Sequence, residues 1–547
     1  MDTVRSADPL WYKDAVFYQL HVKSFADSNG DGIGDFPGLT SKLDHLASLG
    51  VDCLWLQPMY PSPFKDDGYD ISDYTSIHPG YGTQQDFEKF LSQAHARGLR
   101  VIIELVLNHT SDQHAWFQES RASRDNPRAD WYVWADARPD GAPPNNWQSV
   151  FGGPSWHWEM QRQQYYLHHF LREQPNLNWH NPAVVDAMLG EARSWLDRGI
   201  DGFRLDAITT LVHDPLLRDN PPRDPAAVNF NTGGPMFSPY RYQVHLHDRD
   251  QPQILALLER VRALCEPYGA FTMGEIGDSD SVGTTARYTA AKRLHTGYNF
   301  LLTQPVFNCD HLRSVVQALE AQVVEGWTTY AFSNHDVPRA VSRWGVLPEL
   351  SGDHDALAAL LLACLFSLRG SVCLYQGEEL GLTEAVVPRE RMVDPWGIEF
   401  WPLFPGRDGS RTPIPWQAGA PAAGFTRGEP WLPMPDEHRA MAIDAQAADP
   451  GSVLARCRQL LGFRRAHPAL RTGTITLRDA PAPLWVFERE GDGERILCVL
   501  NLSNQPASLV IEDGWAALDG HGFASRLEGG ALRLPPFGVF FGGRAPA

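Results

Sequence analysis

An arginine and an aspartate interrupt an apolar stretch of this 547-residue sequence, in the segment "GIDGFRLDAI". Arg204 and Asp206 are two residues apart, so in a strand both side chains point to the same face. Buried charges are rare unless they are paired, and a buried ion pair adds little net stability. The segment therefore indicates either a structural ion pair or a reactive site.

Other apolar runs also end in polar or ionisable residues, which favours the reactive site. These residues are Asn108, His109, Glu275, His335 and Asp336. The sequence has no G-x-S-x-G motif and no Cys/His pair for acyl transfer, so opposed carboxylates indicate acetal chemistry. A retaining glycosidase uses one carboxylate as nucleophile and one as acid, about 5–5.5 Å apart. We expect Arg204 to hold Asp206 ionised for attack, and the apolar strand around Glu275 to suit a general acid.

The elements that would position these residues alternate between apolar strands and helices. Expected strands cover residues 51–58, 99–109, 199–208, 270–276, 329–336 and 370–379, and expected helices cover 37–49, 84–97, 182–198, 251–266, 311–324 and 354–368. Near-continuous apolar strands that alternate with helices predict an α/β fold with a parallel sheet buried on both faces. No glycine-rich phosphate turn follows the first strand, so we predict a closed (β/α)₈ TIM barrel rather than an open sheet.

The alternation is interrupted once and then stops, which predicts three domains. The barrel would comprise residues 1–106 and 175–468. A loop-rich subdomain, residues 107–174, would be inserted after the third strand. Short strands and turns after about residue 469 predict a C-terminal antiparallel β-sandwich, residues 469–547.

Composition excludes several classes of partner. A formal net charge of −19 disfavours nucleic acid and anionic membranes and is compatible with a neutral substrate. The start of the sequence has no apolar signal region, and no stretch approaches 18 apolar residues, so we expect neither secretion nor a membrane span. Seven scattered cysteines are typical of free thiols in a reducing cytoplasm, and we expect a cytoplasmic monomer or homodimer.

Eight sequence blocks together resemble one enzyme superfamily. The blocks "ELVLNHTS", "GFRLDAI", "TMGEI" and "FSNHD" resemble, in order and spacing, the four signature regions of the α-amylase superfamily. The blocks "DSNGDGIGD", "DDGYDISDY", "QPNLNWHNP" and "RDGSRTPIPW" are similar to its α-glucosidase and oligo-1,6-glucosidase branch. The resemblance extends from about residue 11 to 420. It implies an exo-acting retaining α-glucosidase that cleaves, and also transfers, terminal glucose from short α-1,4-linked saccharides such as maltose.

The resemblance also implies residue roles. Asp206 matches the nucleophile, Glu275 the acid/base and Asp336 the stabiliser of the transition state. Asp66 and Arg411 match a pair that closes the glucose subsite, which would make the enzyme exo-acting. The remaining expected sugar-binding residues are Tyr69, His109, Phe151, Phe170, Arg204, Ala207 and His335.

Ala207 follows the nucleophile directly, where oligo-1,6-glucosidases of the family have valine. A stiff β-branched side chain there would press on the second sugar of an α-1,4-linked substrate. Alanine leaves that space open, so we expect maltose to be preferred to isomaltose.

One departure keeps an alternative open. Glu104 stands where the first signature region usually has aspartate, and "ELVLNHTSDQHAWFQ" and "WYKDAVFYQLHVKSF" resemble trehalose synthases, which isomerise maltose. The blocks after Asp336 favour an α-glucosidase, because they form the sugar pocket and its rim. A non-catalytic binding relative is disfavoured by the three intact carboxylates. An aldolase-type barrel would need a lysine at a strand end, and the expected strands have none.

A glycine-rich acidic loop is a candidate cation site. In "DSNGDGIGD", oxygen-bearing side chains alternate along the loop, which is typical of sites for hard divalent ions. The expected ligands are Asp27, Asn29, Asp31 and Asp35, with the Ile33 carbonyl. The twelfth position is Gly38 rather than the glutamate of an EF-hand. The resemblance implies a structural Ca²⁺, with Mg²⁺ as the other ion of this class, and a solvated acidic turn is the alternative.

Overall fold

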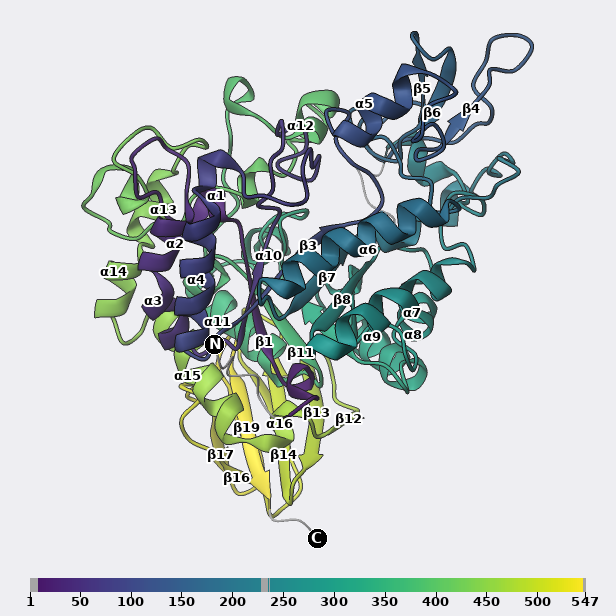
Figure 1. Cartoon of the computed structure of the whole chain (residues 1–547). Coiled ribbons are helices and arrows are strands. Elements are labelled where there is room, and N and C mark those ends of the chain that lie inside the picture. The colour runs from purple at the N-terminus through teal and green to yellow at the C-terminus, as the bar shows by residue number, and fades with distance from the viewer. Residues whose placement is uncertain (1–7, 228–234, 236, 545–547) are drawn as a thin grey trace.

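Eight parallel strands close into a barrel in the computed structural model, which describes residues 8–227, 235 and 237–544 (Figure 1). Around the barrel the strand order is β1, β11, β10, β9, β8, β7, β3, β2. The bounds are β1 Val16–Leu20, β2 Cys53–Leu56, β3 Arg100–Val106, β7 Gly202–Asp206, β8 Phe271–Ile276, β9 Thr296–Asn299, β10 Thr328–Ala331 and β11 Ser371–Tyr375. The predicted (β/α)₈ barrel is confirmed.

The helices around the barrel lie where the sequence predicted them. They include α2 Phe36–Ser41, α3 Leu43–Leu49, α4 Gln84–Ala96, α6 Pro182–Asp197, α7 Ile254–Cys265, α9 Cys309–Gln322 and α11 His354–Ser367. Shorter helices include α1 Val22–Phe25, α8 Ser281–Tyr288, α10 Ala340–Gly345, α12 Pro395–Phe400, α13 Asp436–Ala440 and α14 Ile443–Ala448. α6 illustrates the local causes: Pro182 opens it, and the Asn181 side chain accepts a hydrogen bond from the Ala183 N–H.

Close backbone packing sets the position of the strand that carries Arg204 and Asp206. Arg204 pairs directly with Glu104 on β3, and its other neighbour is Met273 on β8. A Cβ on Gly202 would lie 2.1 Å from the Phe271 carbonyl oxygen, so a larger residue would push β7 away from β8. The Arg204 side chain is therefore held inside the barrel at a fixed height between its neighbours.

An antiparallel sheet follows β3, in the segment predicted as an inserted subdomain. It contains β4 Trp134–Ala135, β5 Trp156–Glu159 and β6 Gln164–Leu167, and α5 Ala115–Ala122 precedes it. In Figure 1 these elements extend from the upper right of the barrel. The extension therefore lies at the end of the barrel where β3 finishes, which is also where β7 presents Asp206.

Two antiparallel sheets form the C-terminal part, at the bottom of Figure 1. One contains β12 Thr474–Arg478, β13 Leu484–Gly491, β14 Glu494–Asn501, β19 Val539–Arg544 and β16 Ala516–Ala517. The other contains β15 Ala507–Val510, β18 Ala531–Leu534 and β17 Arg526–Glu528. These strands lie within the segment predicted as a C-terminal antiparallel domain.

Two buried arginines tie the C-terminal part to the barrel. α15 Val453–Ala466 and α16 Pro468–Arg471 connect the two parts. The Arg464 guanidinium donates to the carbonyl oxygens of Phe366 and Gly370, and Arg489 donates to that of Ser367. Every residue of α11 from Leu357 to Ser367 is buried, so beyond its first turn this helix has no face exposed to water.

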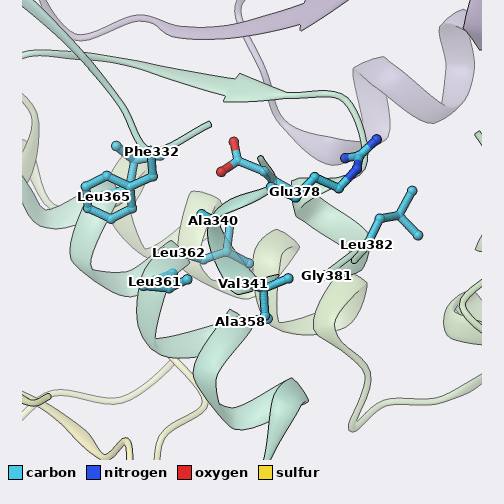
Figure 2. A pocket seen from close by; sticks show the side chains of 11 residues that line it. Phe332, Ala340, Val341, Ala358, Leu361, Leu362, Leu365, Glu378, Gly381 and Leu382 are labelled. Atoms are coloured by element: carbon cyan, nitrogen blue, oxygen red, sulfur yellow. The ribbon is translucent and has the colours of Figure 1, made fainter. Parts of the chain in front are cut away.

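A small internal cavity lies beside α10 and α11. Figure 2 shows the Glu378 carboxylate pointing toward apolar side chains such as Leu362 and Leu365. The cavity has a volume of about 20 Å³, room for about one water molecule. Burial raises the pKa of Glu378 to about 7. The described part of the chain contains no helix that is both long and apolar enough to cross a membrane.

Candidate active site

Arg204 lies at the centre of a cluster of three carboxylates. Its Nη1 is 2.9 Å from Glu104 Oε2 and 2.7 Å from Asp206 Oδ1, and its Nη2 is 2.9 Å from Glu275 Oε2. The guanidinium is fully buried. Two carboxylates that touch one guanidinium lie within a few ångströms of each other, as a retaining pair about 5–5.5 Å apart requires.

The cluster holds three carboxylates against one guanidinium, which favours the retention of a proton. Burial raises the pKa of Asp206 well above its ordinary value, the Glu275 charge raises it further, and Arg204 opposes both. Burial also raises the pKa of Glu104 to about 7, against the lowering effect of Arg204 and Trp55. One guanidinium is shared among three carboxylates, so the expectation that Arg204 holds Asp206 ionised stays a prediction. A cluster in which some carboxyl groups keep a proton and others are ionised can supply both an acid and a nucleophile.

Asp336 has the opposite electrostatic environment. Its Oδ1 is 2.9 Å from Arg407 Nη1 and 3.5 Å from Arg411 Nη2, and its Oδ2 is 3.4 Å from His335 Nε2. Burial alone would raise the pKa of Asp336, but His335 and the two arginines outweigh it and hold the pKa below its ordinary value. Asp336 thus remains an anion that can face developing positive charge.

The structure corrects the predicted pair between Asp66 and Arg411. Asp66 Oδ1 is 2.8 Å from Arg407 Nη2, and Arg407 Nη2 is also 2.6 Å from Asp394 Oδ1. Arg411 instead lies 3.3 Å from Asp67 Oδ2 and donates to the His335 carbonyl oxygen. Both arginines belong to the block "RDGSRTPIPW", four residues apart, and only the fold decides which of them reaches Asp66.

The cavity at the end of the barrel contains most of the predicted sugar-binding residues. Its volume is about 510 Å³, within the usual range for a small-molecule site. Of the predicted residues, Asp66, Tyr69, His109, Phe151, Phe170, Asp206, Ala207, Glu275, His335 and Asp336 line it. Arg204 lies behind the carboxylates, and Arg411 is not among the lining residues.

Two histidines and two phenylalanines contribute to this wall. Burial lowers the pKa of His109 to about 3, so its ring is neutral. Its ring centroid is 5.3 Å from that of Phe170, which is 6.0 Å from that of Phe151. The Tyr69 ring is nearly parallel to the His335 ring, with centroids 5.3 Å apart. The wall therefore combines flat apolar surfaces with neutral polar atoms, as a sugar requires.

Ala207 has an unusual backbone conformation. Its φ of 43° and ψ of 38° lie in the left-handed region, which is uncommon for residues other than glycine, asparagine and aspartate. The Ala207 N–H donates to Glu275 Oε2 over 2.8 Å. The sharp turn after β7 thus aims this N–H at the acid/base candidate and places the Ala207 methyl group at the cavity wall.

Three residues of the site were missed at the sequence level. Arg407 and Asp394 form the ion pair described above, and Gln174 Nε2 lies 3.0 Å from both Asp66 Oδ2 and His109 Nε2. Gln174 belongs to the block "QPNLNWHNP", so that block was the available signal for it. Asp394 begins the segment "DPWGIEFWPLFPGRDGSRTPIPW", one of the blocks after Asp336 that favour an α-glucosidase, so that segment was the available signal for it.

The acidic loop is closed by hydrogen bonds to its own side chains. Asp27 accepts hydrogen bonds from the N–H groups of Asn29, Gly30 and Gly32, which curls the loop around its carboxylate. In the described part of the chain, none of the three loop aspartates (27, 31 and 35) forms an ion pair. Their oxygens accept hydrogen bonds from N–H groups of the loop and from the Ser28 and Thr426 hydroxyl groups. No group of three or more His, Cys, Asp or Glu side chains within the described residues is arranged for a metal. The cation site expected in this loop, with the Asn29 oxygen and the Ile33 carbonyl among its ligands, stays a prediction.

Comparison with known proteins identifies the family. The alpha-amylase family, in its catalytic-domain description, matches residues 19–473, and this chain belongs to that family. A probable alpha-glucosidase of Rhizobium meliloti is 46% identical over 97% of this chain and 96% of its own. An oligo-1,6-glucosidase of Heyndrickxia coagulans is 34% identical over 93% of this chain and 96% of its own. The predicted superfamily is therefore confirmed.

Solved structures share the whole fold. The alpha-glucosyl transfer enzyme XgtA is 50% identical, with a TM-score of 0.95 over 98% of this chain and 99% of its own. The trehalulose synthase MutB of Pseudomonas mesoacidophila is 33% identical, with a TM-score of 0.88 over 97% of this chain and 99% of its own.

Proposed function

We propose that this chain is an exo-acting retaining α-glucosidase that cleaves, and also transfers, terminal glucose from short α-1,4-linked saccharides such as maltose. Glucosidase-type activity is supported by the family and by the relatives named glucosidases. The observation that carries the mechanism is the contact of Asp206 and Glu275 with the same guanidinium in a cavity that also contains Asp336.

In this mechanism Asp206 attacks the anomeric carbon of the terminal glucose while Glu275 protonates the departing oxygen. The result is a glucosyl-enzyme ester and a free sugar. Glu275, now a carboxylate, then takes a proton from water or from a sugar hydroxyl, which displaces Asp206 and retains the configuration. Asp336 stays ionised and stabilises the positive charge that develops on the ring between these states.

Exo action is supported by the ion-paired group formed by Asp66, Arg407 and Asp394. Asp66 is buried and receives hydrogen bonds from Arg407 and from Gln174. Charged donors and acceptors fixed at one side of a cavity can bind the hydroxyl groups at the non-reducing end of a chain. A longer chain would have to pass through this group, so glucose at the end of the chain is the unit removed.

The long segment after β7, residues 213–250, supports a preference for short substrates. Pro235, Phe237, Tyr240, Arg241 and Arg249 of this segment line the cavity, while residues 228–234 and 236 of it lie outside the described part. Loops at this end of a barrel shape the substrate site. Glucosyl transfer is supported by the fold shared with an alpha-glucosyl transfer enzyme.

We further propose that the acidic loop (Asp27, Asn29, Asp31, Ile33 and Asp35) binds a structural Ca²⁺, with Mg²⁺ as the other ion of its class. The three carboxylates gathered in one loop without an ion pair support this, and the ion would stabilise the fold without entering the reaction. The seven cysteines are free thiols, which supports a reducing cytoplasm as the compartment.

Products from maltose, isomaltose, sucrose and trehalose test the proposal. We expect free glucose from maltose, with α-glucose as the first anomer observed by NMR, because double displacement retains configuration. Initial β-glucose would contradict the mechanism, and accumulation of trehalose from maltose would instead identify a trehalose synthase. Asp206→Ala should abolish turnover. Glu275→Gln should spare activated aryl glucosides more than maltose, since a good leaving group needs no acid.

A further inference from the structure

We propose that Gln19, on β1, is a positioning residue that fixes the tautomer of His335 and thereby the direction of a hydrogen-bond chain across the floor of the site to Glu104. The inference rests on the proposed function, because it assumes that His335 and the carboxylate cluster act on the sugar. Gln19 itself does not line the cavity.

The first hydrogen bond of this series, between Gln19 and His335, determines which ring nitrogen of His335 carries the hydrogen. Gln19 is fully buried, and its Nε2 is 2.7 Å from His335 Nδ1. An amide nitrogen can only donate, so Nδ1 accepts and the neutral ring carries its hydrogen on Nε2. The His335 ring is neutral because burial, helped by nearby arginines, lowers its pKa well below the ordinary value despite Asp336.

The second step passes through Tyr69 to Glu104. His335 Nε2 is 2.7 Å from the Tyr69 hydroxyl oxygen, so its N–H donates to that oxygen. The Tyr69 hydroxyl hydrogen is then free to donate to Glu104 Oε1, 3.1 Å away. Each donor in the chain thus faces an acceptor, from Gln19 to the carboxylate that also contacts Arg204.

The reverse direction is electrostatically unfavourable. If the Gln19 amide were turned round, its oxygen would accept from Nδ1–H, and Nε2 would present a lone pair. That lone pair would face the ionised Asp336 Oδ2, 3.4 Å away. The Tyr69 hydroxyl would turn toward His335 and present its own lone pairs to Glu104. Glu104 would lose the donor from Tyr69, and Asp336 would face a lone pair, in a buried site where such arrangements are costly.

Substitution of Gln19 by an isosteric apolar residue tests the effect on catalysis. Gln19→Met removes the donor and leaves His335 free to adopt either tautomer. We expect kcat on p-nitrophenyl α-glucoside to fall about tenfold, with a much smaller change in KM, because substrate contacts are retained.

The matched control is Gln57→Met. Gln57 is 1% exposed, directly follows the neighbouring strand β2, and has no hydrogen bond to His335 among the described residues. The Gln57→Met substitution should leave kcat within about twofold of the value for the unsubstituted protein. Equal effects of the two substitutions on kcat would overturn the proposal.

A double-mutant cycle tests the chain itself. Gln19 and Glu104 are connected through His335 and Tyr69. If the hydrogen-bond chain couples Gln19 to Glu104, the double variant Gln19→Met/Glu104→Gln should retain a higher kcat than independent effects predict. We expect its kcat to be at least about threefold above the value obtained by multiplying the two single effects. This coupling should vanish in a Tyr69→Phe background, which lacks the connecting hydroxyl. If the effects of the two single substitutions on kcat multiply in the double variant, the proposed hydrogen-bond chain is contradicted.

A spectroscopic measurement is independent of turnover. In protein labelled with ¹⁵N-histidine, the His335 signals are identified by their loss in His335→Gln. We expect an unprotonated Nδ1 and a protonated Nε2 in the unsubstituted protein, and a mixture of both tautomers in Gln19→Met. A protonated Nδ1 in the unsubstituted protein would overturn the proposal even if the enzyme proved inactive on every glucoside. If only the proposed glucosidase function is wrong, the protein should show no turnover of glucosides while His335 still carries its hydrogen on Nε2.

Discussion

Ala207 offers a direct test of linkage specificity, through the substitution Ala207→Val. The Ala207 side chain lines the cavity directly after the proposed nucleophile. A β-branched side chain there is stiff and would press on the second sugar of an α-1,4-linked substrate. An α-1,6 link places that sugar farther away. We therefore expect the unsubstituted enzyme to prefer maltose to isomaltose.

Two free energies enter the result and must be separated. One contact of methyl size in a pocket is worth about 1–3 kcal/mol, or roughly 10–200-fold in kcat/KM. The left-handed conformation of Ala207, with φ of 43°, adds a second effect on folding. A branched residue in this conformation costs about 1–2 kcal/mol, so Ala207→Val should also lower the melting temperature.

The ratio of kcat/KM for maltose to that for isomaltose isolates the contact, because the fraction of folded enzyme cancels in a ratio. We expect Ala207→Val to lower this ratio by roughly 10-fold or more. Ala207→Gly is the control, since it relieves the backbone strain and adds no contact. It should leave the ratio nearly unchanged and the melting temperature equal or higher. The reasoning fails if the unsubstituted enzyme prefers isomaltose, or if the valine variant changes stability but not the ratio.

Further predictions concern the closed end of the pocket, the acidic loop and the buried glutamate. Arg407→Met should lower kcat/KM on maltose by about 10–100-fold, because hydrogen bonds to charged groups contribute about 1.5–3 kcal/mol. Arg411→Met should lower kcat/KM less. A larger loss for Arg411→Met than for Arg407→Met would support the pairing of Asp66 with Arg411 that the sequence predicted. Chelation by EDTA should lower the melting temperature more than the activity measured before unfolding. An unchanged melting temperature would argue for a solvated turn. Glu378, with a folded pKa of about 7 against an ordinary value of 4.5, binds its proton more tightly when folded. Its contribution to stability is complete below about pH 4.5 and is lost as pH rises toward about 7. Glu378→Gln should therefore show a smaller decrease in melting temperature between pH 5 and 8 than the parent protein, and an identical decrease would contradict the shift.

The fold could be predicted from the sequence wherever strands are apolar and bounded by capped helices. β7 and β11 are such strands. No residue range was predicted for the strands β1 and β9. β9 consists of "TGYN", a short segment with a glycine and little apolar character, and its identity as a strand comes from pairing with β8 and β10. Tertiary pairing, rather than local preference, decides such segments.

The sequence could predict which residues form the candidate site, but not which of them contact one another. The residues at the strand ends were identifiable because parallel strands bring their carboxyl ends to one face. The choice between Arg407 and Arg411 was not, since it depends on how an irregular segment of chain folds back over the barrel. The sharing of Arg204 among three carboxylates likewise depends on the register of β3 against β7.

The uniform burial of α11 has a consequence for how this protein can be recombined. Its outer side is covered through α15, while Arg464 and Arg489 bond the carbonyl groups at and beyond its end. A gene fragment that stopped at the last barrel strand would present the long apolar part of α11, and several carbonyl groups without donors, to water. Such a fragment should aggregate rather than fold. In evolution and in engineering, the barrel and the C-terminal sheets must therefore be inherited, swapped or fused as one unit.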